Sequence, residues 1–385
     1  MAAKSRERDG ASHRRPRAAL VQDHVAQRGG AERVGLVLLE ALGIDTLHTS
    51  VFAPDRTYPD FAEVDVRTRP FSRLPPIRRN HRLAFPLMPM GMGRIEAPAD
   101  VLLAASAGWS HGVPAAGRKV VYWYAPPRWI YQQEEYLGSR GWVSRAVRAA
   151  TPLLRAWDRR AVASIDRHLA VSEEVADRLR RFYGVEAAVV HPPITLDGSP
   201  TPVDGVEPGH LLVVSRLLSY KHVHVVAEAM RHLPDRRLVV VGTGPFEQEI
   251  RRRAPDNVDL VGSVSDDELC WLYQNCSVLV AAAFEDFGLT PLEAAAHGRP
   301  TVALRAGGYL DTVEEGLTGL FFESLAHGDV ISAVEKALAS DWDPDTLRDH
   351  AARFSQDRFI ERIQAIVEEE LRCQTDSSAL APRTS

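Results

Sequence analysis

The sequence predicts an α/β protein with two doubly wound parallel sheets that face each other across a cleft. Apolar runs of strand length alternate with helical segments along the chain, and this alternation occurs twice. A stretch rich in Gly, Pro and Asp, residues 195–209, separates the two series. At 385 residues the chain also exceeds the usual size of one hydrophobic core, which favours two domains.

The first series is expected to form a domain over residues 17–200. Residues 1–16 are basic and polar without the apolar core of a secretory signal, so we expect a disordered tail there. A glycine loop opens an amphipathic helix over 28–42, and a second helical pattern covers 145–166. Strands are expected at 18–25, 45–52, 100–106, 119–124 and 167–172.

The second series is expected to form a domain over residues 206–354. An amphipathic helix over 355–372 is predicted to pack back towards the first domain, and residues 373–385 look like a disordered tail. Helical patterns cover 224–233 and 266–276. Strands are expected at 210–217, 236–244, 258–264, 278–283 and 300–308.

Composition excludes several classes of protein. The formal net charge is −5 and 45% of residues are hydrophobic, which is ordinary for a globular protein. No window approaches the length of an apolar transmembrane span, and no nucleic-acid recognition motif appears. Cys270, Cys276 and Cys373 lack the spacing of a metal site, and their odd number suits a reducing compartment. We therefore expect a cytoplasmic protein that binds no nucleic acid.

The stretch FEDFGLTPLE, residues 284–293, places two carboxylates eight positions apart. Gly288 and Pro291 argue against a continuous helix between them, so strand, loop and helix is the better interpretation. Glu285 then lies at the carboxyl end of the strand 278–283, and Glu293 lies on the following helix. In open α/β sheets ligands bind outside those strand ends.

That helix start is suited to a nucleotide. Backbone N–H groups from Phe287 to Thr290 could bind a phosphate, and Glu293 could accept hydrogen bonds from a ribose diol. Arg216 and Lys221 follow another strand end, where two cations suit a diphosphate. The alternatives stay open, because carboxylates are favourable near any helix N-terminus and the cations could be solvated surface charges.

Two glycine turns adjoin these residues. GTGP, residues 242–245, fails as a dinucleotide-binding fingerprint, because Glu247 stands where the last glycine is required. A glycine-rich turn at the cleft that includes Gly244 remains reasonable. Gly307 and Gly308 could form a second turn of this kind or a plain surface turn.

Taken together and in order, SRLLSYK, VVVGTGP, LVGSVSDDEL, FEDFGLTPLE and AGGYLDTV resemble the nucleotide-binding half of the family 4 retaining glycosyltransferases, which have the GT-B fold. The two glutamates with seven residues between them match that family's signature. In the first half, LVQDHVAQRGGAERV, LAASAGWSHGV and VVYWYAPPRWIYQQEEYL resemble a bacterial, mannosyltransferase-like subgroup that builds surface polysaccharides. The resemblance covers roughly residues 17 to 370.

The resemblance implies metal-independent, retaining transfer from a nucleotide sugar, GDP-mannose being favoured, to a glycan, lipid-linked or small-molecule acceptor. It implies no cofactor beyond the nucleotide sugar as co-substrate. Arg216 and Lys221 would hold the diphosphate and Glu285 the donor sugar, as the catalytic set. Implied donor contacts are Gly244, Val264, Phe287, Gly288, Leu289, Thr290 and Glu293, and implied contacts on the acceptor or reaction-centre side are Gly29, Gly30, His111, Tyr124 and Arg128.

One residue departs from the subgroup pattern. Tyr124 stands where the subgroup usually has a His near the donor sugar, and a tyrosine cannot act as a base near neutral pH without a large pKa shift. The chain could tolerate the change, use an unusual acceptor, or transfer weakly. His111 matches the subgroup, but a single His is more often structural. A nucleotide-sugar binder with lost activity and a GT-B epimerase therefore remain alternatives.

Residues 66–95 contain seven arginines and no acid, interleaved with Phe, Leu and Met. Such a segment resembles a surface that meets anionic lipid headgroups at the inner face of a membrane. A polyprenyl-diphosphate-linked acceptor would suit it. The other interpretation is a basic loop that binds a soluble acceptor.

Overall fold

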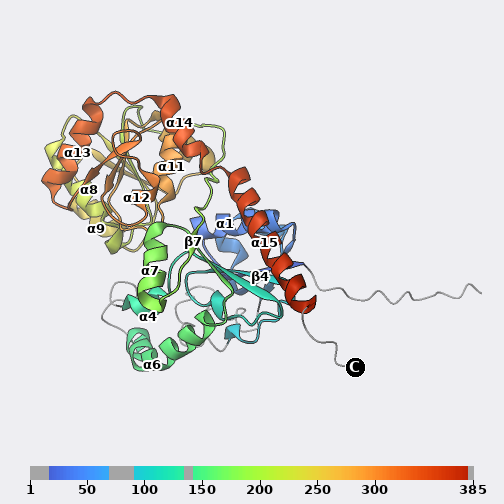
Figure 1. Ribbon diagram of the computed structural model, residues 1–385. Coiled ribbons are helices and arrows are strands. Elements are labelled where there is room, and N and C mark those ends of the chain that lie inside the picture. Colours follow the sequence, from blue (N-terminus) through green and yellow to red (C-terminus); the bar gives the residue numbers. More distant parts are fainter. Residues whose placement is uncertain (1–16, 69–90, 134–141, 380–385) are drawn as a thin grey trace, which may run out of the picture.

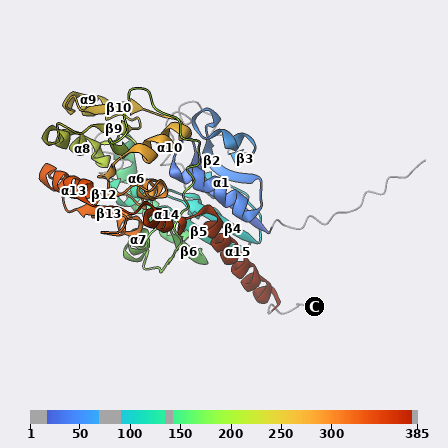
Figure 2. The same ribbon diagram turned by 90° about the horizontal axis from the view of Figure 1, so that it is seen from above.

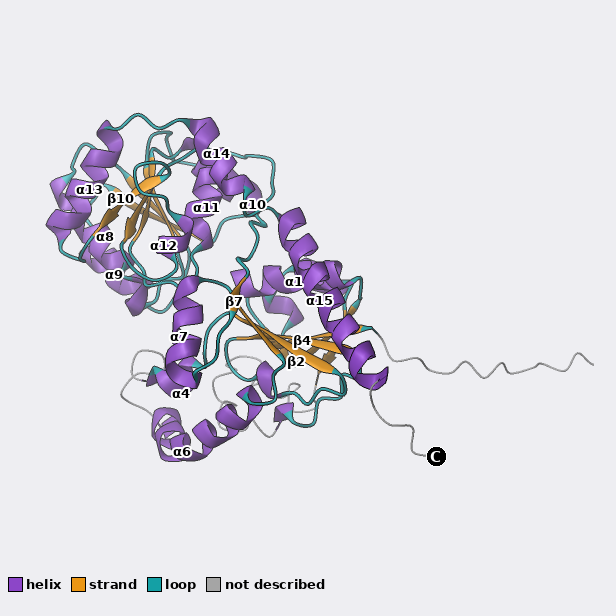
Figure 3. Cartoon of the chain, viewed as in Figure 1, coloured by secondary structure: helices purple, strands orange, loops and turns teal. Residues whose placement is uncertain are grey.

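The computed structural model describes residues 17–68, 91–133 and 142–379. It contains two α/β domains, each built around a parallel sheet with helices on both faces (Figures 1 and 3). The predicted fold class is therefore confirmed. The N-terminal half of the chain forms one sheet and the C-terminal half the other, and a connection without regular structure joins them after residue 189.

The N-terminal sheet has seven parallel strands in the order β3-β2-β1-β4-β5-β6-β7. Its central strands β1 and β4 are buried along nearly their whole length, because helices cover both faces of a parallel sheet. The strands are β1 Ala18–Val25, β2 Thr46–Phe52, β3 Asp65–Thr68, β4 Val101–Ser106, β5 Arg118–Trp123, β6 Arg167–Ala170 and β7 Ala188–Val189.

Four α-helices lie in the described part of this half. The first begins directly after Gly29 and ends at Gly43, which has a left-handed backbone conformation suited to glycine. The last begins after Ser172, whose side chain accepts a hydrogen bond from the Val175 N–H. The helices are α1 Gly30–Leu42, α4 Arg128–Tyr131, α6 Trp142–Val162 and α7 Glu173–Tyr183.

The C-terminal sheet has six parallel strands in the order β10-β9-β8-β11-β12-β13. The strands are β8 Leu211–Val214, β9 Leu238–Val241, β10 Val258–Gly262, β11 Val278–Ala281, β12 Thr301–Leu304 and β13 Gly319–Phe322. The 3₁₀ helix η6 Ser219–Lys221 follows β8. The helices are α8 Val223–Ala229, α9 Glu247–Arg253, α10 Asp266–Asn275, α11 Leu289–Ala296, α12 Tyr309–Thr312, α13 His327–Ala339 and α14 Pro344–Ala352.

Both sheets reverse their strand order at one point, between β1 and β4 and between β8 and β11. Ligands of doubly wound sheets bind outside the carboxyl ends of the strands at such a point. Gly29 and Gly30 follow β1, and Glu285 follows β11. The two switch points therefore put the predicted site residues of each half at the expected edge.

The last helix, α15 Gln356–Ala379, runs from the C-terminal domain along the N-terminal one (Figures 1 and 2). Phe359, Ile363 and Ile366 are buried in the same hydrophobic cluster as β1, β4 and β5. The helix continues past residue 372, where the sequence placed its end. None of the helices in the described ranges is both long and apolar enough to cross a membrane.

Candidate active site

The loop between β11 and α11 carries FEDFG and shows why this sequence turns where it does. Gly288 precedes α11 with a φ of +92°, a conformation that disfavours other residues. A Cβ atom there would also lie 2.6 Å from two ring carbons of Tyr309. Glu293 lies on α11, as predicted. The sequence therefore forms strand, loop and helix, with one carboxylate on the loop and the other on the helix.

Glu285 and Lys221 form an ion pair at this edge of the sheet, through Glu285 Oε1 and the Lys221 ammonium group. Lys221 ends the 3₁₀ helix that follows β8, so the two residues come from neighbouring strands. The Lys221 side chain is 9% exposed and that of Glu285 is 27% exposed. The structure thus brings together two residues that the sequence predicted as catalytic.

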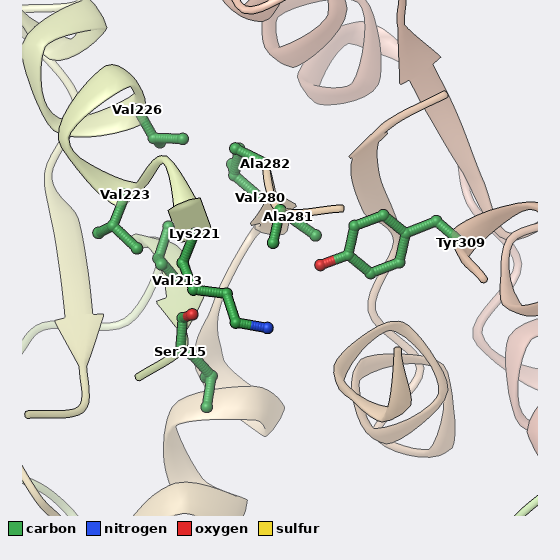
Figure 4. Close-up of a pocket in the computed structure, with 11 residues that line it drawn as sticks. Val213, Ser215, Lys221, Val223, Val226, Val280, Ala281, Ala282 and Tyr309 are labelled. Carbon is green, nitrogen blue, oxygen red and sulfur yellow. The ribbon is translucent and has the colours of Figure 1, made fainter. Parts of the chain in front are cut away.

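A small pocket opens beside this pair at the ends of β8 and β11 (Figure 4). The Lys221 amino group and the Tyr309 hydroxyl group point towards the same space. Burial, together with the negative charge of Glu285, raises the pKa of Tyr309 well above its usual value, so its hydroxyl group stays protonated. The pocket therefore offers a cation and a neutral hydrogen-bonding group.

Arg216 reaches from the C-terminal domain towards the N-terminal one. Its Nη1 donates a hydrogen bond of 3.2 Å to Gln27 Oε1, in the loop that leads into Gly29 and Gly30. A Cβ atom on Gly30 would lie 3.1 Å from Leu289 Cδ1, at the start of α11. The glycine loop and the α11 N-terminus therefore meet, and Arg216 lies where they do.

Glu293 lies in a buried, polar part of the C-terminal domain. The Tyr273 hydroxyl group donates a 2.7 Å hydrogen bond to Glu293 Oε2, and burial raises the pKa of Glu293. Val264 packs partly buried against the cluster that includes Tyr273. Thr290 lies in the first turn of α11, whereas the Phe287 ring turns inward and stacks on His191 at 5.4 Å.

Gly244 supports the Arg216 loop. A Cβ atom at Gly244 would lie 2.3 Å from the carbonyl oxygen of Leu217, so the turn after β9 packs directly on the loop after β8. This close approach requires glycine at Gly244. The turn that contains Gly244 therefore lies against the loop that carries Arg216.

On the N-terminal side, Glu32 is a feature that the sequence interpretation missed. Its side chain is 1% exposed, and burial raises its pKa to about 8. His24 Nε2 lies 4.0 Å from Glu32 Oε1. Burial has the largest effect on both groups, lowering the pKa of His24 and raising that of Glu32, and the positive charge of Arg216 acts on both with a smaller effect. Glu32 looked like an ordinary residue of a helix first turn, so only its burial reveals it.

Tyr124 adjoins the same turn. Its hydroxyl group donates a 3.2 Å hydrogen bond to the carbonyl oxygen of Ala31. Burial raises its pKa well above the usual value, and the negative charges of Glu32 and Asp23 act in the same direction. Tyr124 is therefore a neutral hydrogen-bond donor at neutral pH and has no capacity to act as a base there.

His111 is not brought together with these residues. It is fully buried, with Nδ1 at 3.1 Å from Ser106 Oγ and Nε2 at 2.9 Å from Asp158 Oδ1. The rings of Trp123 and Trp157 lie 4.8 and 5.2 Å from it. Both ring nitrogens therefore have hydrogen-bond partners in the interior of the N-terminal domain.

Arg128 contacts the C-terminal domain instead. Its Nη2 donates a 2.5 Å hydrogen bond to Asp286 Oδ1, which also accepts one of 2.7 Å from Arg178 Nη1. Sequence interpretation missed Asp286, although it lies between two residues singled out, and Arg178, whose helix α7 was not predicted. Position inside the FEDFG motif was the one signal available for Asp286.

Two further expectations concern the basic segment 66–95 and the absence of a metal site. Of the basic segment 66–95, residues 69–90 lie outside the described residues. Among the side chains that the structure describes, no group of three His, Cys, Asp or Glu residues gathers as metal ligands would.

Comparison with known proteins assigns the two halves separately. The family model described as "Glycosyl transferases group 1" matches residues 205–358, and the one described as "Glycosyltransferase Family 4" matches residues 28–197. Together they cover most of both domains. The boundary between them falls in the irregular connection that joins the two sheets.

Two curated relatives are similar to part of the chain. A D-inositol 3-phosphate glycosyltransferase of Mycobacterium sp. (strain KMS) is 28% identical over 271 residues, 61% of this chain and 60% of that protein. A GDP-mannose-dependent alpha-mannosyltransferase of Corynebacterium glutamicum is 32% identical over 129 residues, 33% of this chain and 31% of that protein. The chain thus matches about 60% of the length of the first of these relatives.

A solved structure extends the similarity of fold. HepE from Anabaena, in complex with UDP, superposes with a TM-score of 0.65 at 16% identity, covering 91% of this chain and 100% of that one. At that identity the comparison shows the shared fold alone. The arrangement of two Rossmann-like domains is thus common to this chain and to a protein that binds UDP.

Proposed function

Since the chain belongs to the family 4 glycosyltransferases of the GT-B fold, we propose that it transfers a hexose from a nucleotide sugar to an acceptor hydroxyl group with retention of anomeric configuration. The observation that carries this proposal is the Lys221–Glu285 ion pair at the C-terminal switch point, where Arg216 follows the same strand as Lys221. A diphosphate needs cations, and a sugar needs a hydrogen-bond acceptor. This edge of the sheet supplies both.

The proposed mechanism assigns the proton to the leaving group. The bond between the anomeric carbon and the diphosphate oxygen breaks, and the acceptor oxygen attacks from the same face. The proton of the acceptor hydroxyl group passes to the departing diphosphate oxygen. Because negative charge develops on that oxygen, Arg216 and Lys221 contribute most and no metal ion is required. Glu285 binds the donor sugar rather than forming a covalent intermediate.

For the rest of the donor site, we propose the roles that the family resemblance implies. Glu293 accepts hydrogen bonds from the ribose, and its buried position makes each such bond strong. The N-terminus of α11, from Gly288 to Thr290, faces the phosphates with its free N–H groups. Gly29 and Gly30 let the N-terminal backbone approach from the other side.

We propose GDP-mannose as the donor, because the Corynebacterium glutamicum relative is named as dependent on it and the sequence resembles mannosyltransferases. UDP in the HepE structure makes a UDP-sugar the second candidate. The acceptor is proposed to be a glycan, a lipid-linked sugar or a small molecule. The relative named for D-inositol 3-phosphate favours an acceptor that carries a phosphate group.

A second candidate function is binding of a nucleotide sugar with weak transfer, and Tyr124 is the observation that favours it. Tyr124 has no capacity to act as a base, and its hydroxyl group is hydrogen-bonded to Ala31. Transfer in which the diphosphate takes the proton does not need a base at this position. The active enzyme is therefore the better-supported proposal.

We also propose a cytoplasmic location with peripheral contact at the membrane through residues 66–95. The support is the excess of arginines over acids in that segment, seven to none. This contact would bring the acceptor side of the enzyme to a lipid-linked substrate.

The test of the function is transfer itself. The protein is incubated with GDP-mannose or UDP-glucose and candidate acceptors, and the anomeric configuration of the product is read from the one-bond C1–H1 coupling constant in NMR spectra. The expected product keeps the α configuration of the donor. An inverted product would contradict the proposed mechanism, and nucleotide binding without any transfer would favour the second candidate function.

A further inference from the structure

Asp286 ties the loop that carries Glu285 to the other domain. Its Oδ1 accepts hydrogen bonds from Arg128 Nη2 at 2.5 Å and from Arg178 Nη1 at 2.7 Å. Its carbonyl oxygen accepts one from Ser172 Oγ at 2.5 Å. All three donors belong to the N-terminal half, and Asp286 belongs to the C-terminal half. These three hydrogen bonds to the residue next to the proposed sugar-binding carboxylate thus come from the opposite domain, while Glu285 itself is also bonded within its own domain, to Lys221 and to the Gly308 N–H.

The three charged side chains in these contacts are shielded from water to different degrees. The Arg178 side chain is 3% exposed, that of Arg128 is 19% exposed and that of Asp286 is 28% exposed. Burial alone would raise the pKa of Asp286, but the charges of Arg128 and Arg178 outweigh it and lower the pKa. Asp286 is therefore ionised at neutral pH. If the domains part, the carboxylate loses both partners and is solvated by water instead.

The ion pairs continue on either side of Asp286. Arg178 Nε donates a 2.8 Å hydrogen bond to Glu174 Oε1, which fixes the arginine on α7. On the other side, the negative charge of Glu285 contributes to the raised pKa of Arg128, after the larger effect of Asp286. Charges of alternating sign therefore run from Glu174 through the two arginines to Glu285 and its partner Lys221.

We propose that Asp286 is a positioning residue, whose contacts with Arg128 and Arg178 hold Glu285 in its working place when the two domains are together. The proposal rests on the proposed function, since it assigns Glu285 to the donor sugar. Asp286 itself touches neither sugar nor phosphate. Its contribution comes through the backbone of the loop and through Arg128.

This role differs from that of a simple structural brace. A brace would contribute to stability, and its loss would lower the melting temperature without changing turnover per folded molecule. A positioning residue changes the turnover number, because a displacement of about 1 Å at a reacting group can cost about a hundredfold in rate. Nucleotide affinity should stay nearly unchanged, because Glu293 and the N-terminus of α11 lie within the C-terminal domain.

The test uses the full-length chain with the substitution Asp286→Asn, which keeps the shape and removes the charge. The matched control is Asp259→Asn, which removes the acid of the exposed Arg237–Asp259 pair, away from the loop. We expect the turnover number of Asp286→Asn to fall by about tenfold or more, while the dissociation constant for the nucleotide changes by less than about threefold. The control should change neither value by more than about twofold.

A second measurement keeps the proposal testable if turnover is too low to follow. Small-angle X-ray scattering of the nucleotide-bound protein should show a larger radius of gyration for Asp286→Asn than for the wild type. Should Asp286→Asn fail to fold, Arg178→Lys replaces it, because lysine keeps the charge but loses the fork that pairs with both Glu174 and Asp286.

Three results would overturn the proposal, and the first two concern turnover and domain arrangement. One is unchanged turnover in Asp286→Asn, and the other is an unchanged scattering curve in the nucleotide-bound variant. Loss of nucleotide affinity by the same factor as turnover would also overturn it, because Asp286 would then belong to the donor site. Absence of transfer by the wild type would instead contradict the proposed function. The scattering measurement would still test whether the contacts of Asp286 with Arg128 and Arg178 hold the two domains together.

Discussion

The two halves of this protein share one strand order but present different groups at their switch points. The C-terminal half places an ion pair, Lys221 with Glu285, at the carboxyl ends of its strands. The N-terminal half offers the backbone of Gly29 and Gly30, with the buried carboxyl group of Glu32 behind it. Under the proposed function, the C-terminal half would stabilise charge on the ligand and the N-terminal half would let its backbone approach that ligand closely.

This division leads to different expectations for substitutions in the two halves. On the C-terminal side, loss of one charge should remove transition-state stabilisation and affect turnover. On the N-terminal side, the first turn of α1 should affect stability and its pH dependence more than the chemistry. The predictions below are ordered from the largest expected effect to the smallest.

The largest effect is expected from Lys221→Met. The ammonium group would no longer meet the charge that develops on the leaving diphosphate, and Glu285 would lose its ion-pair partner. We expect transfer to fall by about a hundredfold or more, as measured by initial rates at saturating donor. Lys336→Met, on the exposed face of α13, is the control and should keep the wild-type rate. A Lys221→Met enzyme with nearly wild-type turnover would contradict the claim that charges of the C-terminal half stabilise the leaving diphosphate.

An intermediate effect is expected from Glu32→Gln, in stability rather than in turnover. Burial raises the pKa of Glu32 from 4.5 in the unfolded chain to about 8 in the folded one. The stability associated with its proton is therefore fully present below about 4.5 and is lost as pH rises to about 8. Over that range the loss is on the order of 5 kcal/mol at most.

Glu32→Gln cannot lose that proton, so its melting temperature should rise above that of the wild type as pH increases from 5 to 8. Glu268 provides the matched control, because it occupies the same position in the first turn of α10 but is exposed and bonded to Ser265, which lowers its pKa. Glu268→Gln should show no gain at alkaline pH. Parallel melting curves for wild type and Glu32→Gln across this range would show that Glu32 is ionised in the folded chain.

The smallest effect is expected from Tyr124→Phe. The substitution removes one hydrogen bond to the Ala31 carbonyl group, which contributes about 1 kcal/mol to stability. Transfer should stay within about threefold of the wild-type rate, because the leaving diphosphate takes the acceptor proton. Thermal melting and initial rates measure the two effects. A tenfold or greater loss of transfer would place the Tyr124 hydroxyl group at the reaction centre. It would contradict the claim that the N-terminal half affects stability more than the chemistry.

Much of the fold could be predicted because buried parallel strands appear as continuous apolar runs. The strands β8, β9 and β11 have that pattern and were predicted, and β1 was predicted from the apolar run that begins it. The edge strand β3 is partly exposed at every position, and β7 has two residues, so neither gave a signal. The helices α7, α13 and α14 were also missed, although Ser172 before α7 and Asp343 before α14 are typical capping residues.

The site was predicted to different extents in the two halves for a physical reason. Glu285, Gly288 and Glu293 lie in one short segment, so their shared position follows from local structure. The contact between Arg178 and Asp286 joins residues 108 positions apart, and it depends on how the two domains meet. The burial of Glu32 likewise depends on tertiary packing. His111 matched a motif, yet its position was decided by the buried Asp158.

The most direct test of the central claim is calorimetric titration of the wild type and of Glu293→Gln with GDP, UDP, ADP and dTDP. The claim is that the C-terminal half holds the nucleotide through Glu293 and the N-terminus of α11. It predicts that one nucleotide binds the wild type well ahead of the others, and that Glu293→Gln weakens that binding by about tenfold or more. Absence of binding to the folded wild-type chain, or equal binding to the variant, would contradict it.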